Sequence, residues 1–364
     1  MSARVLVAMS GGVDSSVAAA LLREQGYDVV GVAMRLTPEA PAPASRRRST
    51  CCSHEDFEDA RRVAERMDFP FYVVDLRADF AARVVGNFVS EYLGGRTPNP
   101  CVMCNREIKF DRLWSRARAL EADFVATGHY ARIERDSGGR FHLRRAIDSS
   151  KDQSYFLFTL GQRELARTLF PLGAMAKTEV RQRARALGLR NADKAESQEI
   201  CFVPDGDYAS FVERAAQPAE IRRGRIVTAE GRALANHDGV HNFTVGQRRG
   251  LGVAAGTPMY VREIRAATGE VVVGSRDELN SAGLVAEQVK MVDPALMQGG
   301  EIALEVKIRY RHPALPARLQ MLSGERAEIR FDHCGPAVTP GQACVFYRGD
   351  EVLGGGFIER AVEG

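Results

Sequence analysis

Two stretches of this sequence carry residues that could do chemistry. Cys101 and Cys104 stand at C-x-x-C spacing in "NPCVMCN", and the stretch "MSGGVDSS" at 9–16 combines glycines, hydroxyls and one carboxylate. A cysteine pair at this spacing can bind a metal, form a disulfide, act as a redox pair or supply a nucleophile. The local sequence does not choose among these roles, so the rest of the chain must decide.

The stretch 9–16 has the composition of an anion-binding loop. Its glycines let the backbone turn tightly and approach an anion without a Cβ in the way, and Ser10, Ser15 and Ser16 add hydroxyl donors. N–H groups exposed at the start of the helix that follows attract phosphate. The Gly-Lys-Ser/Thr ending of a Walker loop is absent. We expect a phosphate loop of another kind, with an ordinary glycine-rich turn as the alternative.

The elements around this loop predict a parallel sheet. Residues 4–10 form a short apolar strand, and "DSSVAAALLREQG" after it has helical spacing. Further strands are predicted at 29–36, 71–76 and 123–130, with helices between them. Strands separated by helices imply a parallel sheet with right-handed crossovers. A Pro/Ala/Ser/Arg stretch without periodicity at 37–50 is predicted to be a mobile loop.

The pattern changes after about residue 217. Short alternating runs and glycine-containing turns replace the helical windows, which indicates antiparallel strands. We therefore predict the fold class α/β, with a doubly wound parallel sheet over 1–205. A small linker domain over 206–280 and a C-terminal antiparallel β-barrel over 281–364 follow it.

Composition narrows the class of protein. A chain of 364 residues is too long for one ordinary core, and 45% hydrophobic with 27% charged residues is typical of a soluble globular protein. No apolar run is long enough to span a membrane and no export signal is recognisable, so we expect a cytoplasmic protein without a membrane partner. In a reducing cytosol, the seven cysteines favour catalytic or metal-binding roles over stable disulfides. The net charge of +3 is too small to establish a polyanionic partner.

The loop resembles that of a known superfamily. "SGGVDS" matches S-G-G-x-D-S, the pyrophosphate-binding loop of the ATP pyrophosphatases (PP-loop proteins), whose members activate a carbonyl oxygen as an adenylate and release pyrophosphate. The resemblance implies that Asp14 helps to hold Mg²⁺ with the phosphates, as suits a hard cation. It places Met34 beside the adenine, with a core methionine as the alternative. The implied contacts to ATP are Ala8, Met9, Ser10, Gly11, Gly12, Val13, Asp14, Ser15, Ser16, Met34 and Gly128.

Six further motifs narrow this resemblance. They occur in one order over nearly the whole chain, and together they resemble the tRNA-specific 2-thiouridylases, which place sulfur on C2 of the wobble uridine. The resemblance implies an ATP-dependent tRNA-uridine 2-sulfurtransferase. The motifs are "GGRTPNPCVMCNREIKF" (94–110), "ATGHYAR" (126–132), "KDQSYFL" (151–157), "ESQEICFV" (196–203), "VGQRRGLG" (245–252) and "KIRYRHP" (307–313).

Thiolation of this kind requires two cysteines. Adenylation turns the C2 oxygen into a leaving group, and a sulfur nucleophile must then reach the same carbon. By motif, Cys201 in "EICF" is similar to the persulfide carrier and Cys104 in "MCN" to the nucleophile. Cys104 either attacks the base or resolves the persulfide by forming a disulfide. Because the chain has no pyridoxal-phosphate signature, we expect a cysteine desulfurase or a sulfur-relay protein to supply the sulfur.

Cys101 departs from the family's commoner pattern, in which Asp follows "NP". It could be a bystander, or it could assist redox resolution with Cys104. A third interpretation makes Cys101, Cys104 and Cys201 ligands of a [4Fe-4S] cluster whose open iron binds sulfide. A structural zinc is disfavoured because no fourth ligand is evident. Cys334 and Cys344, in the predicted barrel, are expected to be structural.

The resemblance also implies contacts to tRNA. The target base must be flipped into a pocket, with the surrounding phosphates held by basic groups and amides. Asn99, Pro100 and Cys101 are assigned to the base. For the other positions, the alternative is an ordinary strand-end histidine, a solvated turn or an exposed charged strand. These positions are His129, Lys151, Asp152, Gln153, Arg309, Tyr310 and Gln342.

Two rival functions stay open. An amidating or lysine-ligating pyrophosphatase would share the phosphate loop but would have no use for Cys104 and Cys201. A non-catalytic, nucleotide-sensing RNA-binding protein would use the same residues for binding alone. Release of pyrophosphate that depends on tRNA separates catalysis from sensing.

Overall fold

The computed structural model describes most of the chain. The predicted loop at 37–50 lies almost wholly outside the described residues, and so do residues 196–199, the first four of the motif that contains Cys201. The described residues are 2–38, 54–194, 200–253, 256–298 and 300–363.

The chain folds into two compact units, each built from more than one stretch of sequence. The first unit holds the glycine-rich loop together with Cys101, Cys104 and Cys201. The domain boundaries at 205 and 280 stay predictions. Unit 1 comprises 1–84, 101–206 and 350–352, and unit 2 comprises 85–100, 207–349 and 353–364.

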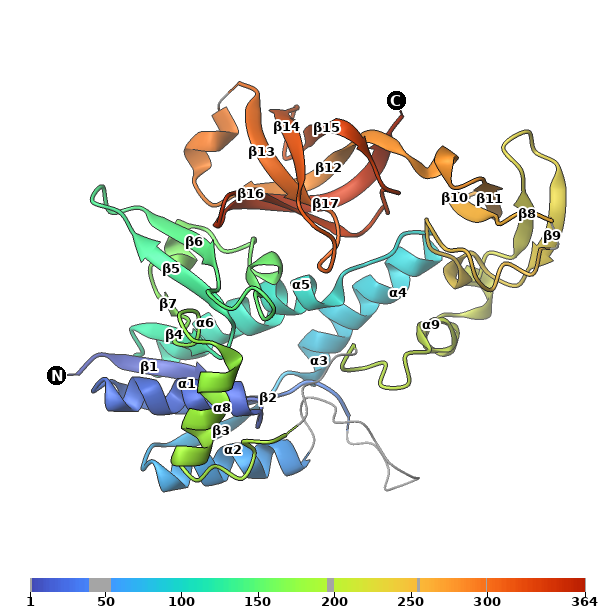
Figure 1. Ribbon diagram of the computed structural model, residues 1–364. Coiled ribbons are helices and arrows are strands. Elements are labelled where there is room, and N and C mark those ends of the chain that lie inside the picture. The colour runs from blue at the N-terminus through green and yellow to red at the C-terminus, as the bar shows by residue number, and fades with distance from the viewer. Residues whose placement is uncertain (1, 39–53, 195–199, 254–255, 299, 364) are drawn as a thin grey trace. The chain divides into compact units, whose positions relative to one another are not determined.

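A five-stranded parallel sheet forms the centre of unit 1 and confirms the predicted α/β class (Figure 1). The strand order is β3-β2-β1-β4-β7, and all neighbouring strands are parallel. Val5, Leu6 and Val7 of the central strand have no exposed surface, and burial of each contributes roughly 1.5–3 kcal/mol. The strands are β1 (Arg4–Ala8), β2 (Asp28–Arg35), β3 (Phe71–Asp75), β4 (Phe124–Thr127) and β7 (Thr168–Leu169).

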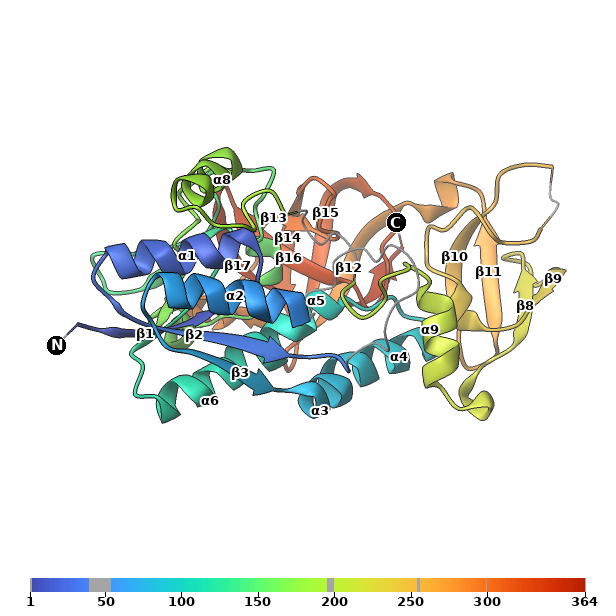
Figure 2. The same ribbon diagram turned by 90° about the horizontal axis from the view of Figure 1, so that it is seen from below.

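Helices cover both faces of this sheet, as strands of a parallel sheet require. Figure 2 shows α1 (Val13–Glu24) and α2 (His54–Arg66) on one side of the strands and α6 (Asp111–Ala119) on the other. Helix α8 (Lys177–Ala186) packs against α1. A late segment of unit 1 is therefore brought next to the helix that follows the glycine-rich loop.

The C-x-x-C motif lies on a helix. Helix α5 spans Pro100–Cys104 and continues through a π-helical stretch, η2 (Asn105–Phe110), into α6. Proline is favoured at the first position of a helix, because its missing N–H has no partner there. Cys101 and Cys104 are therefore about one helical turn apart on neighbouring positions of one face.

Short elements complete unit 1. Strands β5 and β6 form an antiparallel hairpin, and the first residues of β17 pair with β6, with Glu351 opposite Arg144. The elements are α3 (Arg77–Phe80), η1 (Ala81–Val85), β5 (Ala131–Arg135), β6 (Phe141–Arg145), η3 (Ser154–Phe156) and α7 (Gln162–Leu165).

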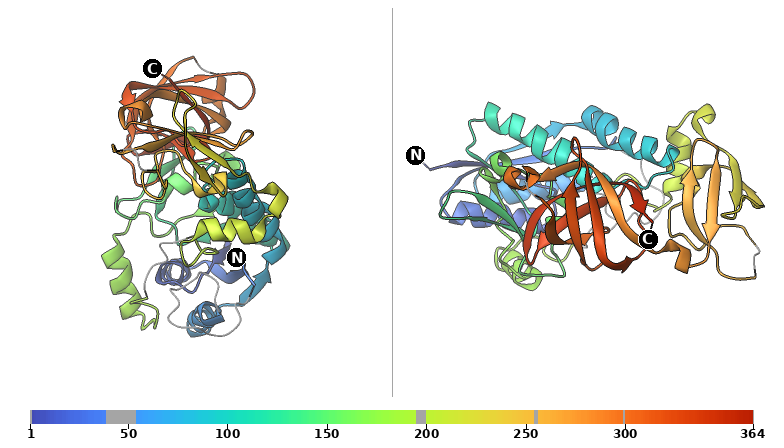
Figure 3. Two further views of the ribbon diagram at one scale, coloured as in Figure 1. Left: turned by 90° about the vertical axis from the view of Figure 1, so that its right-hand side faces the viewer. Right: turned by 90° about the horizontal axis from the view of Figure 1, so that it is seen from above.

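Unit 2 contains the antiparallel β-barrel that the sequence predicted. The strand order is β12-β15-β14-β13-β16-β17, and β12 also pairs with β17, so the strands close on themselves (Figure 3). The interior is apolar: Leu319, Ile329 and Phe346 are fully buried. The strands are β12 (Ser281–Met291), β13 (Ile302–Lys307), β14 (Leu315–Met321), β15 (Ala327–Gly335), β16 (Ala343–Arg348) and β17 (Glu351–Val362).

The two barrel cysteines differ from each other. Cys344 on β16 is fully buried, and this burial raises the pKa of its thiol to about 12, as expected of a structural cysteine. Cys334 near the end of β15 is exposed. The expectation that Cys334 is structural stays a prediction.

A smaller, four-stranded sheet also belongs to unit 2. Its strand order is β10-β11-β8-β9. No helix among the described residues is long and apolar enough to cross a membrane. The remaining elements of unit 2 are α4 (Gly86–Leu93), α9 (Tyr208–Ala215), η4 (Pro218–Glu220), β8 (Gly224–Val227), β9 (Ala233–His237), η5 (Val240–Asn242), β10 (Tyr260–Arg265), β11 (Glu270–Gly274), η6 (Asp277–Leu279) and η7 (Pro294–Gln298).

Candidate active site

The glycine-rich loop joins the carboxyl end of β1 to the start of α1, as predicted. Gly11 has φ of 71°, and a Cβ there would collide with the backbone of Asp56. Gly12 is the N-cap of α1 and has no side chain with which to cap it. The N–H groups of the first helical turn have no acceptor within the helix. Together with the helix dipole, they make this turn a site for a phosphate group.

The loop lies where the strand order of the sheet reverses. Strand β1 has β2 on one side and β4 on the other, and ligands of doubly wound sheets bind beside the carboxyl ends of strands at such a point. Gly128 follows β4, and a Cβ there would lie 2.7 Å from Ser15 N. The backbone of Gly128 therefore packs directly against the start of α1, and its contact with ATP stays a prediction.

Hydroxyl groups hold the loop in shape. Ser15 Oγ accepts from Ser10 N at 3.1 Å and donates to Gly12 O at 3.2 Å. Ser16 Oγ donates to the same carbonyl at 3.0 Å. Ser15 and Ser16 are buried, whereas Ser10 is exposed. Of the three serines predicted to face the phosphates, Ser10 has the accessible hydroxyl.

Asn191 is a loop contact that the sequence did not reveal. Its amide donates to Gly11 O and to Ser16 Oγ, both at 3.0 Å, and the residue is 5% exposed. A lone asparagine far along the chain carries no signal in sequence. This bond ties the turn after α8 to the phosphate loop.

Asp14, the predicted magnesium ligand, is held by two other side chains. Its Oδ1 accepts from Tyr130 Oη at 2.7 Å and from Lys177 Nζ at 2.8 Å, and its Oδ2 accepts from Lys177 Nζ at 2.7 Å. A carboxylate has about four lone-pair directions. Oδ2 therefore retains one direction for a metal, and a single carboxylate with phosphate oxygens is a common Mg²⁺ ligand set. The residues present fit Mg²⁺ through one oxygen of Asp14.

The other predicted ATP residues lie at the same edge of the sheet. Ala8, Met9 and Val13 are buried, so mainly their backbone groups can face a nucleotide. Met34 is the second-last residue of β2 and is 9% exposed. Its position at a carboxyl end is compatible with an adenine contact, which stays a prediction.

Cys201 lies in a turn that is tied to this edge. The turn is closed by a hydrogen bond of 2.9 Å from Val203 N to Ile200 O. Phe202 packs edge-on against Phe80, with ring centroids 5.6 Å apart. Phe80 belongs to α3, which begins immediately after the carboxyl end of β3. Cys201 itself is half-buried.

A lysine upstream reinforces this tie. Lys194 Nζ donates to Asp56 Oδ1 at 2.7 Å and to Asp59 Oδ2 at 2.9 Å on α2. Although burial opposes it, these hydrogen bonds raise the pKa of Lys194. Since Asp56 also abuts Gly11, residues 191–194 are fastened to the phosphate loop at two places.

Cys104 is connected to the carboxyl edge of the unit 1 sheet through residues that follow β4. It is half-buried at the end of α5, and the next residue, Asn105, donates to Phe156 O at 3.0 Å. Phe156 N donates to Gln153 O at 3.0 Å. Gln153 in turn exchanges backbone and side-chain hydrogen bonds with Tyr130, after β4. Both candidate cysteines of unit 1 are thus anchored at the carboxyl edge of its sheet.

The cluster-ligand interpretation of the cysteines is not supported. Among the described residues, which include Cys101, Cys104 and Cys201, no group of three or more His, Cys, Asp or Glu side chains could hold a metal ion. Cys101 is exposed, whereas the other two are half-buried. The three thiols do not form a ligand set, so the structure does not support a [4Fe-4S] cluster bound by these cysteines.

His129 is enclosed rather than presented to a partner. It is 9% exposed, its Nδ1 lies 2.7 Å from Thr127 Oγ1, and its ring is parallel to that of Phe110 at 6.3 Å. Burial, aided by the charge of Lys109, holds the pKa of His129 well below its ordinary value. The imidazole is therefore neutral. Its contact with tRNA stays a prediction.

The polar turn at 151–153 is organised by its own hydrogen bonds. Asp152 Oδ1 accepts from Ala146 N and Ser154 N, each at 3.1 Å, and its Oδ2 accepts from Ser154 Oγ at 2.9 Å. Asp152 is 7% exposed, while Lys151 and Gln153 are half-buried. Within this turn, Lys151 and Gln153 present more surface to a partner than Asp152 does.

The remaining predicted tRNA residues belong to unit 2. Arg309 donates to Ala337 O at 3.2 Å and to Thr339 Oγ1 at 2.7 Å. The Lys307 ammonium lies 5.6 Å from the centroid of the Tyr310 ring. Gln342 donates to two backbone carbonyls of the segment before α5, Thr97 O at 3.0 Å and Pro98 O at 3.1 Å. Asn99 and Pro100 end the same segment of this unit.

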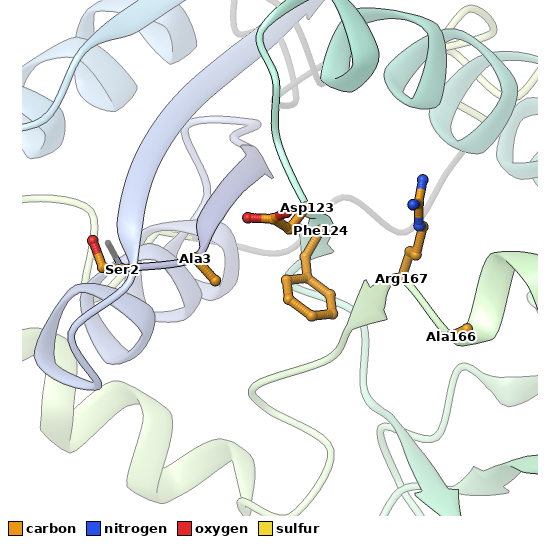
Figure 4. Close-up of a pocket in the computed structure, with 6 residues that line it drawn as sticks. All are labelled: Ser2, Ala3, Asp123, Phe124, Ala166 and Arg167. Atoms are coloured by element: carbon orange, nitrogen blue, oxygen red, sulfur yellow. The ribbon is translucent and has the colours of Figure 1, made fainter. Parts of the chain in front are cut away.

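A pocket of unit 1 lies elsewhere. Figure 4 shows it at the amino ends of β1 and β4, the opposite edge of the sheet from the phosphate loop. It has a volume of about 510 Å³. Because it is remote from the glycines, cysteines and carboxylate described above, we do not assign the nucleotide to it. Its lining residues are Ser2, Ala3, Asp123, Phe124, Ala166 and Arg167.

Comparison with known proteins covers nearly the whole chain. Three family models match: a tRNA methyl transferase HUP domain at 3–205, a tRNA methyl transferase PRC-barrel domain at 209–275 and an aminomethyltransferase beta-barrel domain at 281–358. A tRNA-specific 2-thiouridylase MnmA from Geotalea uraniireducens is 53% identical over 363 residues, which cover 99% of this chain and 96% of the relative. Proteins of the same name from Geobacter metallireducens and Solibacter usitatus are 53% and 51% identical, over 99% and 98% of this chain and 97% and 99% of their own lengths.

Proposed function

Because the chain belongs to the tRNA-specific 2-thiouridylase family, we propose that it is an ATP-dependent tRNA-uridine 2-sulfurtransferase of the cytoplasm. It activates the C2 oxygen of the wobble uridine with ATP and replaces this oxygen by sulfur. The observation that carries the proposal is the convergence of the S-G-G-x-D-S loop and the segments of Cys104 and Cys201 at one edge of the unit 1 sheet.

The phosphate loop serves the activation step. The N–H groups of Gly12, Val13 and Asp14 at the start of α1 bind the phosphate chain, and Ser10 adds its exposed hydroxyl. Mg²⁺ held by Asp14 Oδ2 would neutralise part of the phosphate charge. The uridine C2 oxygen attacks the α-phosphorus of ATP, the bond to the β-phosphate oxygen breaks, and pyrophosphate leaves.

The two cysteines serve the transfer of sulfur. The terminal sulfur of a Cys201 persulfide attacks C2, and the C2–O bond breaks as AMP leaves with the electron pair. The Cys104 thiolate then attacks Sγ of Cys201. The sulfur–sulfur bond breaks, and its electron pair stays on the sulfur attached to C2. Two thiols are oxidised to a disulfide while the transferred sulfur is reduced, so the electrons balance.

Two partners follow from this chemistry. The tRNA supplies the uridine, and the residues assigned to tRNA above would contact it. A cysteine desulfurase or sulfur-relay protein supplies the sulfane sulfur that reloads Cys201, and a thiol reductant reopens the disulfide.

Single cysteine variants test the proposal. Cys104→Ser should keep tRNA-dependent pyrophosphate release but stop at a tRNA linked to Cys201 through a disulfide, visible as a reductant-sensitive band on a denaturing gel. Cys201→Ser should release pyrophosphate and form neither adduct nor 2-thiouridine. Cys334→Ser, which changes an exposed cysteine of unit 2, is the matched control and should behave as wild type. Full modification activity in Cys104→Ser would favour an amidating or lysine-ligating enzyme instead.

The role of Cys101 is tested separately. We expect anaerobically purified protein to contain no stoichiometric iron or acid-labile sulfide, and Cys101→Asp, which restores the commoner residue of the family, to retain thiolation. Iron and sulfide that are present in wild type and lost in Cys101→Asp would overturn this assignment.

A further inference from the structure

Two residues beside the phosphate loop have no role in the scheme above. Lys177 is the first residue of α8 and is 7% exposed. Its ammonium lies 2.8 Å and 2.7 Å from the two oxygens of Asp14. The Tyr130 hydroxyl donates to Asp14 Oδ1 at 2.7 Å, and the same ammonium lies 5.6 Å from the centroid of the Tyr130 ring. One carboxylate at the start of α1 therefore receives a buried cation and a buried hydroxyl.

The exposures of the two charged partners differ. The Asp14 side chain is 29% exposed and that of Lys177 is 9% exposed, so the carboxylate is the more accessible of the two charged groups. Taking an ammonium out of water is costly unless it is paired. Asp14 pairs with it, and the cost is offset.

The position of this pair matters for a polyphosphate. Asp14 is the second residue of α1, so its carboxylate stands beside the N–H groups that would bind phosphate. An uncompensated carboxylate there would repel the phosphate chain, since like charges a few ångströms apart in a poorly solvated site interact strongly. The Lys177 ammonium, in contact with both oxygens of Asp14, offsets this charge.

We propose that Lys177, assisted by Tyr130, is a positioning residue of the nucleotide site. It cancels the charge of Asp14 so that the triphosphate can bind beside it, and it fixes the carboxylate so that the remaining lone pair of Oδ2 faces the metal. The inference rests on the proposed function only for the identity of the nucleotide.

Calorimetric titration of ATP into the full-length chain, with excess Mg²⁺ and separately with EDTA, tests this role. Lys177→Met should raise the dissociation constant of ATP about ten-fold in Mg²⁺ and by more than that in EDTA. Tyr130→Phe should raise it by less. Arg183→Met is the matched control, because Arg183 joins the same α8 to Glu24 of α1 but does not touch Asp14. It should bind ATP as wild type does.

The double variant Asp14→Asn/Lys177→Met separates charge compensation from simple structural support. With neither charge present, it should bind ATP in EDTA within about three-fold of wild type, and Mg²⁺ should no longer tighten binding. A purely structural role for Lys177 predicts that the double variant binds no better than Lys177→Met, and that outcome overturns the proposal.

Folding of each variant is checked by thermal melting. Should Lys177→Met not fold, Asp14→Asn is compared with the double variant in EDTA: tighter ATP binding by Asp14→Asn supports the charge role, and equal binding overturns it. The proposed function fails by a different measurement, namely the absence of tRNA-dependent pyrophosphate release in wild type.

Discussion

At the scale of single residues, close approach of backbones shapes the nucleotide site as much as side chains do. Gly11 and Gly128 lie against Asp56 and Ser15 at distances that leave no room for a Cβ. Both contacts bring later segments of unit 1 onto the start of α1. Their sequence positions were predictable from motifs, but the packing partner of each was not.

Gly128→Ala should damage nucleotide binding. The added Cβ would lie 2.7 Å from Ser15 N and 3.1 Å from Ser15 Cα. The backbone would have to shift to make room for it, which destabilises a packed site by about 1–3 kcal/mol. We expect the ATP dissociation constant to rise about ten-fold in calorimetry. Gly138→Ala, in the turn of the β5–β6 hairpin, is the control. Unchanged ATP binding by Gly128→Ala would show that the contact with Ser15 can relax without cost.

His129 gives unit 1 a dependence on pH whose sign follows from its burial. Its pKa is lowered in the folded state, so the unfolded chain, with an ordinary value near 6.5, binds a proton that the native state refuses. Stability is therefore constant above about pH 6.5 and falls below it, by up to about 1.4 kcal/mol per pH unit. Between pH 7 and pH 5, the melting temperature of His129→Gln should fall by less than that of wild type.

His142 supplies a comparison of opposite sign. Hydrogen bonding with Glu351, and also with Asp136, raises the pKa of His142, although partial burial opposes this rise. Protonated His142 therefore stabilises the fold at low pH, and this contribution is lost as the pH rises through the pKa of His142 in the folded state. His142→Gln should therefore melt more steeply on acidification than wild type. Parallel pH profiles for both histidine variants and wild type would contradict these assignments.

The residues that sequence could identify are those in contiguous motifs. The phosphate loop, Cys104 and Cys201 were found in this way, because their neighbours in sequence are also their neighbours in function. Lys177 and Asn191 escaped notice, since each is a single ordinary residue whose partner lies more than 150 positions away. The contacts of such residues can be identified only from the folded structure.

At the scale of elements, the helix that carries the cysteine pair was not predicted from the sequence. Pro100 opens this helix, because its fixed φ suits the first helical position. The strands were easier to predict: their apolar runs and alternation give signals of their own. The barrel and the parallel sheet were both predicted from such runs.

The segment before α5 is held by residues 340–342, which precede strand β16 of the barrel. Thr97 N donates to Pro340 O at 2.8 Å, and Gln342 donates to Thr97 O and Pro98 O. A Cβ on Gly341 would lie 2.9 Å from Thr97 N, so these backbones run in close contact. This arrangement within unit 2 fixes where the helix bearing Cys104 begins.

Gln342→Met should loosen that start. The side chain keeps its length but loses both donors, at a cost of about 0.5–1.5 kcal/mol per hydrogen bond. We expect faster hydrogen exchange over 95–99 and a several-fold lower kcat/KM for tRNA thiolation, with ATP binding unchanged. Gln320→Met, at an exposed position of β14, is the control. Protection of 95–99 equal to that of wild type would refute the role of Gln342.

At the scale of the whole molecule, the two units are interleaved along the chain. Residues 85–100 interrupt unit 1 in sequence and pack in unit 2, where the Tyr92 ring stacks on Tyr208 at 4.8 Å and Phe88 meets Phe211 at 6.0 Å. Domain boundaries placed where the residue pattern changes always give contiguous domains. They cannot show that residues 85–100 belong to unit 2, because tertiary contacts determine this assignment.

A fragment of residues 1–206 should therefore not fold as an independent domain. It would expose Phe88 and Tyr92, which are 0% and 6% exposed in the full chain, and exposed aromatic clusters drive aggregation. We expect the fragment to bind a hydrophobic dye and to sediment as aggregates, unlike the full-length chain. A monomeric fragment with a cooperative melt and intact ATP binding would disprove this.

The last strand has a consequence for how the protein is made. Residues 350–352 at the start of β17 belong to unit 1, where Asp350 accepts from Arg132 Nη2 at 2.7 Å and Arg144 Nη1 at 2.6 Å. A ribosome delivers these residues only after residues 207–349 of unit 2 have been made. Synthesis of unit 1 is therefore completed after most of unit 2, and a product that terminates before residue 350 lacks the strand residues that pair with β6.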